Sequence, residues 1–313
     1  MNIVIQVVLL VVGFIMLMKG ADWFVEGAAK VADKFGIPQL VIGLTIVAMG
    51  TSAPEAAVSI SAAMRGSAEI TIGNVLGSNI LNILIILGIT ACIRTVPVQK
   101  STVRYEIPFV IVVSVLLACL GLFDGQINRL EGGILWVFMI TYLLYLLWMS
   151  RKGQAVDDEV PELGEKDTPL RMAVSIVVGV ILIIWGSDIA VDAATGLAQI
   201  FGMSERFIGL TIVALGTSLP ELVTSVTAAI KGKADIAVGN IVGSNIFNIL
   251  FVVGTTALIT PVTYSPAFGM DSIAAVAAAV LLLLCVVKGK KLTRAGGIVM
   301  LAAYCGYFAL LIR

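Results

Sequence analysis

The sequence predicts an all-α polytopic membrane protein with ten transmembrane helices in two inverted-topology five-helix repeats. Three observations lead to this prediction. The 313-residue chain is 59% hydrophobic and only 13% charged, whereas a soluble domain is usually about 45–50% apolar and about 25% charged. Several apolar runs approach the roughly 20 residues that cross a bilayer. Finally, the second half of the chain repeats much of the first.

The apolar runs, separated by charged or turn-forming breaks, give ten candidate spans. They lie on either side of residues 151–169, a long polar stretch that we interpret as a linker between a first repeat (1–150) and a second repeat (170–313). The first run has no basic segment before it, so we expect a spanning helix and not a cleaved signal peptide. The expected spans are 3–28, 39–64, 70–93, 105–122, 131–149, 170–196, 206–230, 236–259, 270–287 and 295–312.

The distribution of Lys and Arg predicts the orientation in the membrane. Loops on the cytoplasmic side of a membrane carry an excess of these residues. One set of loops is rich in them, and it contains the central linker. We therefore expect the linker in the cytoplasm, both termini outside, and the protein in the cell (inner) membrane. The rich side holds Lys30, Lys34, Arg94, Lys100, Arg104, Arg151, Lys152, Lys166, Arg171, Lys231, Lys233, Lys288, Lys290, Lys291 and Arg294; the other side holds Arg65, Arg129, Arg206 and Arg313.

A shift of 166 residues aligns Ile42–Thr90 with Ile208–Thr256 without a gap, and 29 of these 49 positions are identical. The period is half the chain, which excludes a solenoid of short repeats. Because each half has five spans, the second copy must enter the membrane from the opposite side, as in many secondary transporters. A duplication preserved only for helix packing would explain the matched Gly and Ala residues but not the matched Glu residues.

The hexamers "GTSAPE" (50–55) and "GTSLPE" (216–221) place Glu55 and Glu221 inside apolar spans. A carboxylate at that depth is costly and normally faces a cavity, a partner or an ion path. We expect no Lys or Arg in the central part of any candidate span, and therefore no buried ion pair. An ion site is the favoured interpretation.

The residues before each Glu supply further oxygen atoms. Thr51 and Glu55 are four positions apart and share a helical face, with Ser52 beside them; Thr217, Ser218 and Glu221 repeat this spacing. The prolines at 54 and 220 remove an amide donor and kink the helix, which frees a backbone carbonyl. Carboxylate, hydroxyl and carbonyl oxygens are the ligands of a hard cation, and Ca²⁺ accepts six to eight of them in flexible geometry.

A second pair of motifs, "GNVLGSNILNIL" from Gly73 and "GNIVGSNIFNIL" from Gly239, adds Ser78 and Asn82 in the first copy. Ser244 and Asn248 are their counterparts. The glycines are best explained by close helix packing. For the Ser and Asn side chains two interpretations remain open, ion coordination and hydrogen bonding between helices.

These paired motifs resemble the two alpha-repeats of the cation/calcium exchanger superfamily, in its prokaryotic sodium/calcium exchanger branch. The resemblance covers essentially the whole chain and implies exchange of cytoplasmic Ca²⁺ for external Na⁺ by alternating access. Some prokaryotic members carry Asp where this chain has Asn248. The coordinating positions that the resemblance implies are Ala48 (backbone oxygen), Thr51, Ser52, Glu55, Ser78, Asn82, Ala214 (backbone oxygen), Thr217, Ser218, Glu221, Ser244 and Asn248.

Three other functions fit the sequence less well. A proton/calcium antiporter with the same fold and glutamates is the nearest, because a buried Glu can carry a proton. A cation channel would use rings of charge or carbonyl groups from several subunits, which a two-fold internal repeat does not favour. An intramembrane enzyme is disfavoured because the chain has no His and no paired catalytic aspartates.

The remaining expectations concern partners. The 20 Lys and Arg balance the 20 Asp and Glu, so net charge does not suggest a nucleic-acid partner. None of the four cysteines forms a CxxC pair, which gives no indication of a redox or zinc site. We expect no cofactor, with Ca²⁺ and Na⁺ as transported substrates, the lipid bilayer as the environment, and no obligate protein partner.

Overall fold

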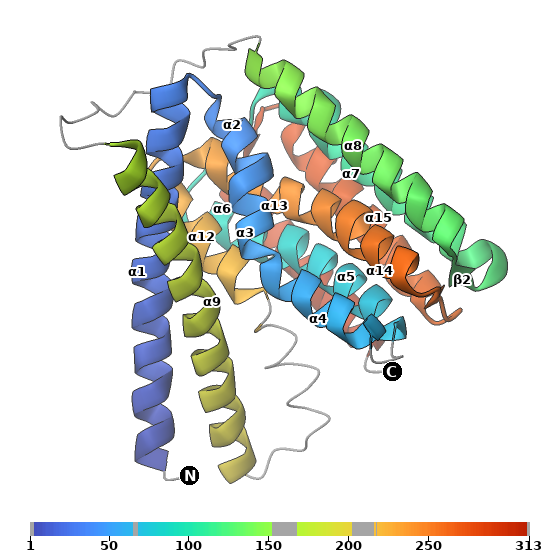
Figure 1. Cartoon of the computed structure of the whole chain (residues 1–313), viewed down its shortest axis with the longest axis horizontal. Helices are drawn as coiled ribbons and strands as arrows, with labels where there is room; N and C mark the ends of the chain where they lie inside the picture. The colour runs from blue at the N-terminus through green and yellow to red at the C-terminus, as the bar shows by residue number, and fades with distance from the viewer. Residues whose placement is uncertain (1–2, 65–67, 152–167, 202–215, 217, 312–313) are drawn as a thin grey trace.

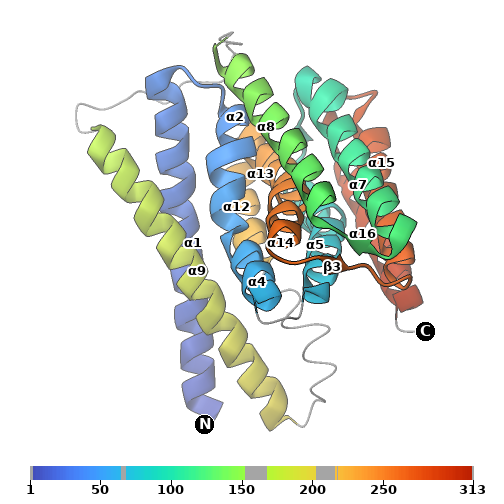
Figure 2. The same ribbon diagram turned by 45° about the vertical axis from the view of Figure 1, so that its right-hand side comes forward.

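The structure, a computed structural model, describes residues 3–64, 68–151, 168–201, 216 and 218–311. In these ranges the chain is almost entirely helical, and most helices lie roughly side by side (Figures 1 and 2). The first half contains α1 (Ile3–Phe35), α2 (Gln39–Ile42), η1 (Gly43–Val47), α3 (Ala48–Thr51), α4 (Ala53–Met64), α5 (Glu69–Leu81), η2 (Asn82–Leu87), α6 (Gly88–Ile93), β1 (Val96–Pro97), η3 (Thr102–Glu106), α7 (Ile107–Asp124), β2 (Gln126–Ile127) and α8 (Arg129–Arg151). The second contains α9 (Pro169–Ile200), α12 (Leu219–Ile230), α13 (Ala234–Phe247), η5 (Asn248–Val253), α14 (Gly254–Ile259), β3 (Val262–Thr263), α15 (Phe268–Val286), β4 (Lys291–Leu292) and α16 (Arg294–Leu311). Elements labelled η are π-helical turns.

The helices agree with the predicted spans to within a few residues in most places. Among the described residues, seven helices are long and apolar enough to cross a membrane, or eight when the bent pair Gln39–Thr51 and Ala53–Met64 is counted as one span. Two shorter apolar helices, Leu219–Ile230 and Arg294–Leu310, lie where two further spans are expected. The chain is therefore a multi-pass membrane protein. The first part of the expected span 206–230 lies outside the described residues.

The first expected span is too short, because α1 continues seven residues past position 28, to Phe35. The distribution of charges placed Lys30 and Lys34 in a loop, but both lie on this helix. Nothing between Glu26 and Phe35 breaks a helix. The helix ends where Gly36 takes a φ of +63°, a left-handed conformation that glycine adopts without strain, and Pro38 follows two residues later.

The second half repeats the elements of the first at the 166-residue spacing. Adding 166 converts η2 into η5, α6 into α14 and β1 into β3 without any change of length. The two short antiparallel ladders follow the same relation. Strand β1 pairs with β4, and β2 pairs with β3, so each ladder joins one strand from each half. The two halves therefore contact each other through two equivalent strand pairs.

Helices α1 and α9 begin the two halves and lie against each other in opposite directions at one side of the molecule (Figures 1 and 2). Gly20 and Gly179 allow their backbones to approach closely. A Cβ atom on Gly20 would lie 2.8 Å from the carbonyl oxygen of Gly179, and one on Gly179 would lie 2.8 Å from the amide nitrogen of Phe24. Small residues at such crossings let membrane helices pack tightly.

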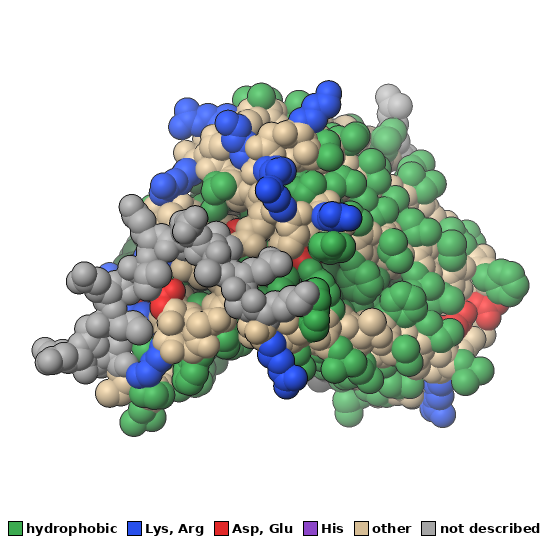
Figure 3. All heavy atoms as spheres, turned by 90° about the horizontal axis from the view of Figure 1, so that it is seen from above, with side chains coloured by type: hydrophobic (Ala, Val, Ile, Leu, Met, Phe, Trp, Pro, Cys, Tyr) green, Lys and Arg blue, Asp and Glu red, His purple; other side chains and the backbone are tan. Residues whose placement is uncertain are grey.

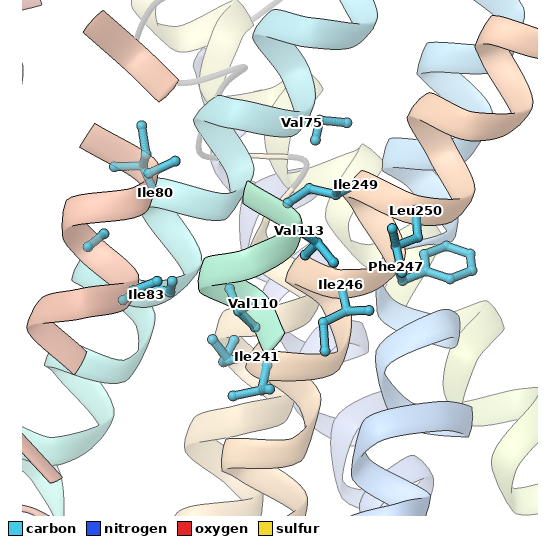
Figure 4. Packing of buried hydrophobic residues seen from close by; sticks show 14 of the residues in the cluster. Val75, Ile80, Ile83, Val110, Val113, Ile241, Ile246, Phe247, Ile249 and Leu250 are labelled. Atoms are coloured by element: carbon cyan, nitrogen blue, oxygen red, sulfur yellow. The ribbon is translucent and has the colours of Figure 1, made fainter. Parts of the chain in front are cut away.

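The larger apolar core surrounds the central helices of both halves. Its side chains come from α5 and η2, from α7, and from α13 and η5, and they interdigitate in Figure 4. Every residue of α13 after Ala234 is buried, so this helix contacts protein on all sides. The labelled core residues are Val75, Ile80, Ile83, Val110, Val113, Ile241, Ile246, Phe247, Ile249 and Leu250.

The outer faces are apolar, as expected for contact with lipid. Exposed large hydrophobic side chains occur on all the long outer helices, including Val11 on α1, Leu144 on α8 and Ile273 on α15. In the view from above, several Lys and Arg side chains gather on one face (Figure 3). That face lies at the C-terminal ends of α1 and α8. The beginning of α1 and the end of α16 lie toward the opposite face (Figures 1 and 2).

Candidate cation site

Glu55 and Glu221 lie in the first turns of α4 and α12, directly after breaks in the helices. The backbone leaves the helical conformation at Ser52 (φ −84°, ψ 8°) and at Ser218 (φ −93°, ψ 4°). In the first half the segments before and after the break differ in direction by 49°. The prolines at 54 and 220 explain these breaks, because neither has an amide hydrogen to donate to the preceding turn.

Both glutamate side chains are buried, with 1% of Glu55 and none of Glu221 exposed. The two glutamates are linked through the turn before Glu55, because Ser52 lies three residues before it. The Ser52 hydroxyl donates to Glu221 Oε1 at 2.8 Å, a contact that joins the two halves. Across the described ranges, both oxygens of Glu55 and the Oε2 atom of Glu221 have no hydrogen-bond partner.

The charge of these carboxylates is not balanced by a basic residue within the described part of the chain. Ion pairs in the described ranges include Lys30 with Glu26 and Lys231 with Asp22, and neither involves a glutamate of the site. Contrary to the expectation that no span has a central basic residue, Lys19 lies midway along α1, but its side chain is exposed. Two buried, unneutralised carboxylates are unfavourable unless a cation or a proton neutralises them.

Neutral oxygen atoms of both halves approach the same place. Thr51 Oγ1 donates to Asn240 Oδ1 at 2.9 Å, and the hydroxyls of Thr51 and Ser244 lie beside the Glu221 carboxylate. The carbonyl oxygen of Ala48 accepts the amide hydrogen of Ser52 at 3.0 Å and lies 3.5 Å from Ser244 Oγ. Three predicted ligands of the first half (Ala48, Thr51 and Ser52) and Ser244 of the second are thus brought together around Glu221.

Asn82 and Asn248 begin the π-helical turns η2 and η5. Each uses its amide nitrogen in a hydrogen bond of 3.1 Å, Asn82 to Asn245 Oδ1 and Asn248 to Asn79 Oδ1. The Oδ1 atoms of Asn82 and Asn248 are buried and accept no hydrogen bond from any described residue. They are therefore available as neutral ligands for a cation.

The other predicted residues are placed less fully. Ser78 is buried on α5, with 5% of its surface exposed. Ser218 is buried, and its hydroxyl has no hydrogen-bond partner in the described ranges. Ala214 and Thr217 lie outside the described residues.

Sequence reasoning did not single out Asn74 and Asn240, which donate hydrogen bonds to the backbone of the two glutamates. Asn74 donates to the Glu55 carbonyl oxygen at 3.2 Å and to Ser59 Oγ at 2.9 Å. Asn240 donates in the same way to the Glu221 carbonyl oxygen at 3.4 Å and to Ser225 Oγ at 2.9 Å. The signal was present in the repeat, because all four polar residues are identical in the two aligned copies.

Two buried carboxylates, with hydroxyl and amide oxygens around them and no basic partner in the described chain, form a candidate membrane-embedded site for a hard cation. Comparison with known proteins agrees with this class. The family model described as "Sodium/calcium exchanger protein" matches residues 5–149 and 172–313. The chain thus belongs to the sodium/calcium exchanger family, in the prokaryotic branch of the cation/calcium exchanger superfamily.

Individual relatives cover nearly the whole chain. The putative antiporter CaxA of Alkalimonas amylolytica is 41% identical over 98% of both chains. The sodium/calcium exchanger MaX1 of Methanosarcina acetivorans is 29% identical over 99% of both. A solved structure of the sodium-calcium exchanger NCX_Mj superposes with a TM-score of 0.84 and 30% identity, covering 99% of this chain and all of that one. The family consists of ion transporters and not of enzymes, and this chain is a membrane antiporter for Ca²⁺ and a second cation.

Proposed function

We propose that the protein exports Ca²⁺ from the cytoplasm in exchange for Na⁺ that enters, by alternating access to one central site. The observation that carries the proposal is the set of buried oxygen atoms without hydrogen-bond donors in the described chain, on Glu55, Glu221, Asn82 and Asn248. With two carboxylates, the site neutralises one Ca²⁺ or a corresponding number of Na⁺ ions. Because both ions need the same negative charge, occupancy by one excludes the other, and this competition couples the two fluxes.

The site residues that we propose as ligands are those of the two motif pairs. Glu55 and Glu221 supply the charge, and the remaining positions supply neutral oxygen. No cofactor is required, because the driving energy comes from the ion gradients. The neutral ligands are Ala48, Thr51, Ser52, Ser78, Asn82, Ala214, Thr217, Ser218, Ser244 and Asn248.

We also propose that the two repeats, 1–150 and 170–313, have inverted topology and together provide ten spans. The opposite directions of α1 and α9 support this arrangement, as do the two matching ladders between the halves. In such transporters the site lies at the interface of the repeats, and one part of the protein moves against the other around it.

The proposed location is the inner membrane, with both termini outside and the linker at 151–169 in the cytoplasm. The face that is rich in Lys and Arg (Figure 3) supports this orientation, because basic residues concentrate on the cytoplasmic side.

Proton/calcium exchange is the second candidate, and one observation favours it. Glu55 is buried with both carboxylate oxygens unpartnered in the described ranges, and a proton would neutralise it as well as a metal ion would. The fold and the glutamates would be the same.

Ca²⁺ uptake into proteoliposomes of the purified protein tests the two candidates against each other. Three conditions are compared: internal Na⁺, internal choline, and internal choline with an imposed pH gradient. We expect uptake only when Na⁺ can leave the vesicles. Uptake driven by the pH gradient alone would reject Na⁺ coupling in favour of protons, and no uptake under either gradient would reject both.

A further inference from the structure

Asn79 and Asn245, one from each half of the chain, form a reciprocal pair at the centre of the molecule. Asn79 Nδ2 donates to the backbone carbonyl oxygen of Asn245 at 3.1 Å, and Asn245 Nδ2 donates to that of Asn79, also at 3.1 Å. Both side chains are buried, with 2% and 1% exposed. We call this pair the amide clasp. It is not among the predicted ligands.

The clasp determines which way its own amides face. A backbone carbonyl oxygen can only accept a hydrogen bond, so the nitrogen end of each clasp amide must face the opposite backbone. The oxygen end of Asn79 then points to Asn248, and the oxygen end of Asn245 points to Asn82. This assignment follows from the acceptor-only chemistry of the carbonyl groups, which removes the usual ambiguity between the two ends of an amide.

The orientation of Asn79 in turn determines the orientation of Asn248. Because Asn79 presents an acceptor, Asn248 must turn its nitrogen toward it, and it does so at 3.1 Å. The Oδ1 atom of Asn248 is therefore directed away from the clasp, and it has no donor within the described residues. Asn82 is oriented by Asn245 in the same way, with the same distance.

We infer that Asn79 and Asn245 are positioning residues that hold the amide oxygens of Asn248 and Asn82 toward the transported cation. The inference rests on the proposed function, since it assigns a role at the same site. Without the clasp, each amide could rotate and present its nitrogen, whose hydrogens repel a cation. The clasp also explains an amide at position 248, because a carboxylate there has no hydrogen to donate to Asn79 when ionised.

A purely structural role is the alternative, in which the clasp only joins the two halves. The two roles differ in what they predict for pairs of substitutions. If Asn79 acts through Asn248, its removal has little further effect once the Asn248 amide is absent. If it only supports the fold, its effect is the same in any background.

The chain offers a matched control, because Asn82 is an equivalent amide that is oriented by the other clasp residue. The measurement is the Ca²⁺ dissociation constant of the purified protein by calorimetry in choline buffer. We expect Asn79→Ala to weaken Ca²⁺ binding about tenfold in the wild type and in Asn82→Ala, as for other groups that orient metal ligands. In Asn248→Ala we expect a further loss of less than about twofold, since the oriented group is missing.

A mirror cycle with Asn245→Ala, in Asn82→Ala and Asn248→Ala backgrounds, gives the same test if Asn79→Ala does not fold. Thr90→Val serves as a packing control, because Thr90 is buried and donates only to the Ile86 carbonyl oxygen of its own helix, at 2.7 Å. Equal losses from Asn79→Ala in both backgrounds would overturn the positioning role and leave the proposed function standing. Wild-type protein that binds neither Ca²⁺ nor Na⁺ would overturn the proposed function and, with it, the inference.

Discussion

Two regions of the candidate site differ in how closely they follow the internal symmetry of the chain. In the amide clasp and the two amides that it orients, four hydrogen bonds form two matching pairs, and all four are 3.1 Å long. The glutamates do not match. Glu221 accepts a hydrogen bond from Ser52 at 2.8 Å, whereas the corresponding Ser218 hydroxyl and Glu55 carboxylate have no hydrogen-bond partner among the described residues.

The difference shows which contacts of the site are the same in the two halves and which are not. Identical residues occupy both regions of the repeat, so the asymmetry does not come from the side chains themselves. The clasp has the same geometry from both halves. The serine–glutamate contacts differ between the halves, and the proposed inverted repeat would show such a difference in either of its two access states.

The largest expected effect tests whether the glutamates carry the charge of the site. Glu55→Gln and Glu221→Gln each remove a full negative charge while preserving shape. A unit charge about 4 Å from an ion is worth about 4 kcal/mol at an effective dielectric constant of about 20. We therefore expect each variant to lower the initial rate of Na⁺-driven Ca²⁺ uptake roughly a hundredfold or more.

Glu106→Gln is the matched control, because Glu106 is a third buried glutamate on a membrane helix and lies outside the site. It accepts a hydrogen bond from the hydroxyl of Tyr145, which Gln can also accept. Uptake should stay within about twofold of the wild type, since no charge of the site is lost. Equal loss in all three variants would mean that burial of charge, and not its place, determines transport.

The next effect concerns Asn74 and Asn240, which donate hydrogen bonds to the backbone of the two glutamates. Asn240→Ala removes the two hydrogen bonds donated to Glu221 and Ser225 and a third accepted from Thr51. Asn74→Ala removes the two equivalent donated bonds in the first half. At about 1 kcal/mol for each bond, we expect the donated bonds alone to make each variant less stable by about 2 kcal/mol. Chemical unfolding in detergent measures this, and a loss below about 0.5 kcal/mol in either variant would mean that these bonds do not stabilise the turn that carries its glutamate.

A smaller effect compares the two serines directly. Ser52→Ala removes the donor to Glu221, so the carboxylate loses a charge-assisted hydrogen bond of about 1.5–3 kcal/mol. Ser218→Ala removes a hydroxyl that has no partner in the described ranges. In ion-free buffer we expect Ser52→Ala to lower the free energy of unfolding by about 1–2 kcal/mol and Ser218→Ala by less than about 0.5 kcal/mol. The reverse order would show that the asymmetry is not a property of the protein in solution.

The smallest effect concerns a contact between the halves at the margin of the molecule. Lys231 Nζ lies 3.1 Å from Asp22 Oδ1, and the two side chains are 33% and 42% exposed. Ion pairs at such exposure contribute about 0–1 kcal/mol. Asp22→Asn should therefore change the free energy of unfolding by less than about 1 kcal/mol, with a smaller difference at high salt. A loss as large as that of Ser52→Ala would mean that this exposed contact between the halves stabilises the fold as much as the buried one does.

The sequence predicted the helical architecture, and it indicated the residues of the candidate site, for physical reasons that are local. Apolar runs show where helices cross a membrane, and a carboxylate such as Glu55 in an apolar run needs an explanation that packing cannot provide. The 166-residue repeat then predicted the counterparts in the second half. Prolines at 54 and 220 predicted the two breaks, because the loss of an amide donor acts within one helical turn.

What the sequence did not predict depends on contacts between distant segments. Asn79 and Asn245 are 166 residues apart, and their reciprocal hydrogen bonds become visible only when the two halves are placed together. Spacing along one helix gave Asn82 and Asn248 two possible roles, as ligands or as hydrogen-bonding groups between helices. In the structure the nitrogen of each amide binds the other half and the oxygen is left available, so the two roles belong to opposite ends of the same group.

The position of a bound divalent ion tests the central claim most directly. Crystals of the protein soaked in Sr²⁺, a heavier analogue of Ca²⁺, would locate the ion by its anomalous scattering. We predict one strong peak between the carboxylates of Glu55 and Glu221, within bonding distance of the amide oxygen of Asn82 or Asn248, and no such peak in Glu221→Gln. An ordered Sr²⁺ ion elsewhere in the membrane region, with both carboxylates unbound, would contradict the account.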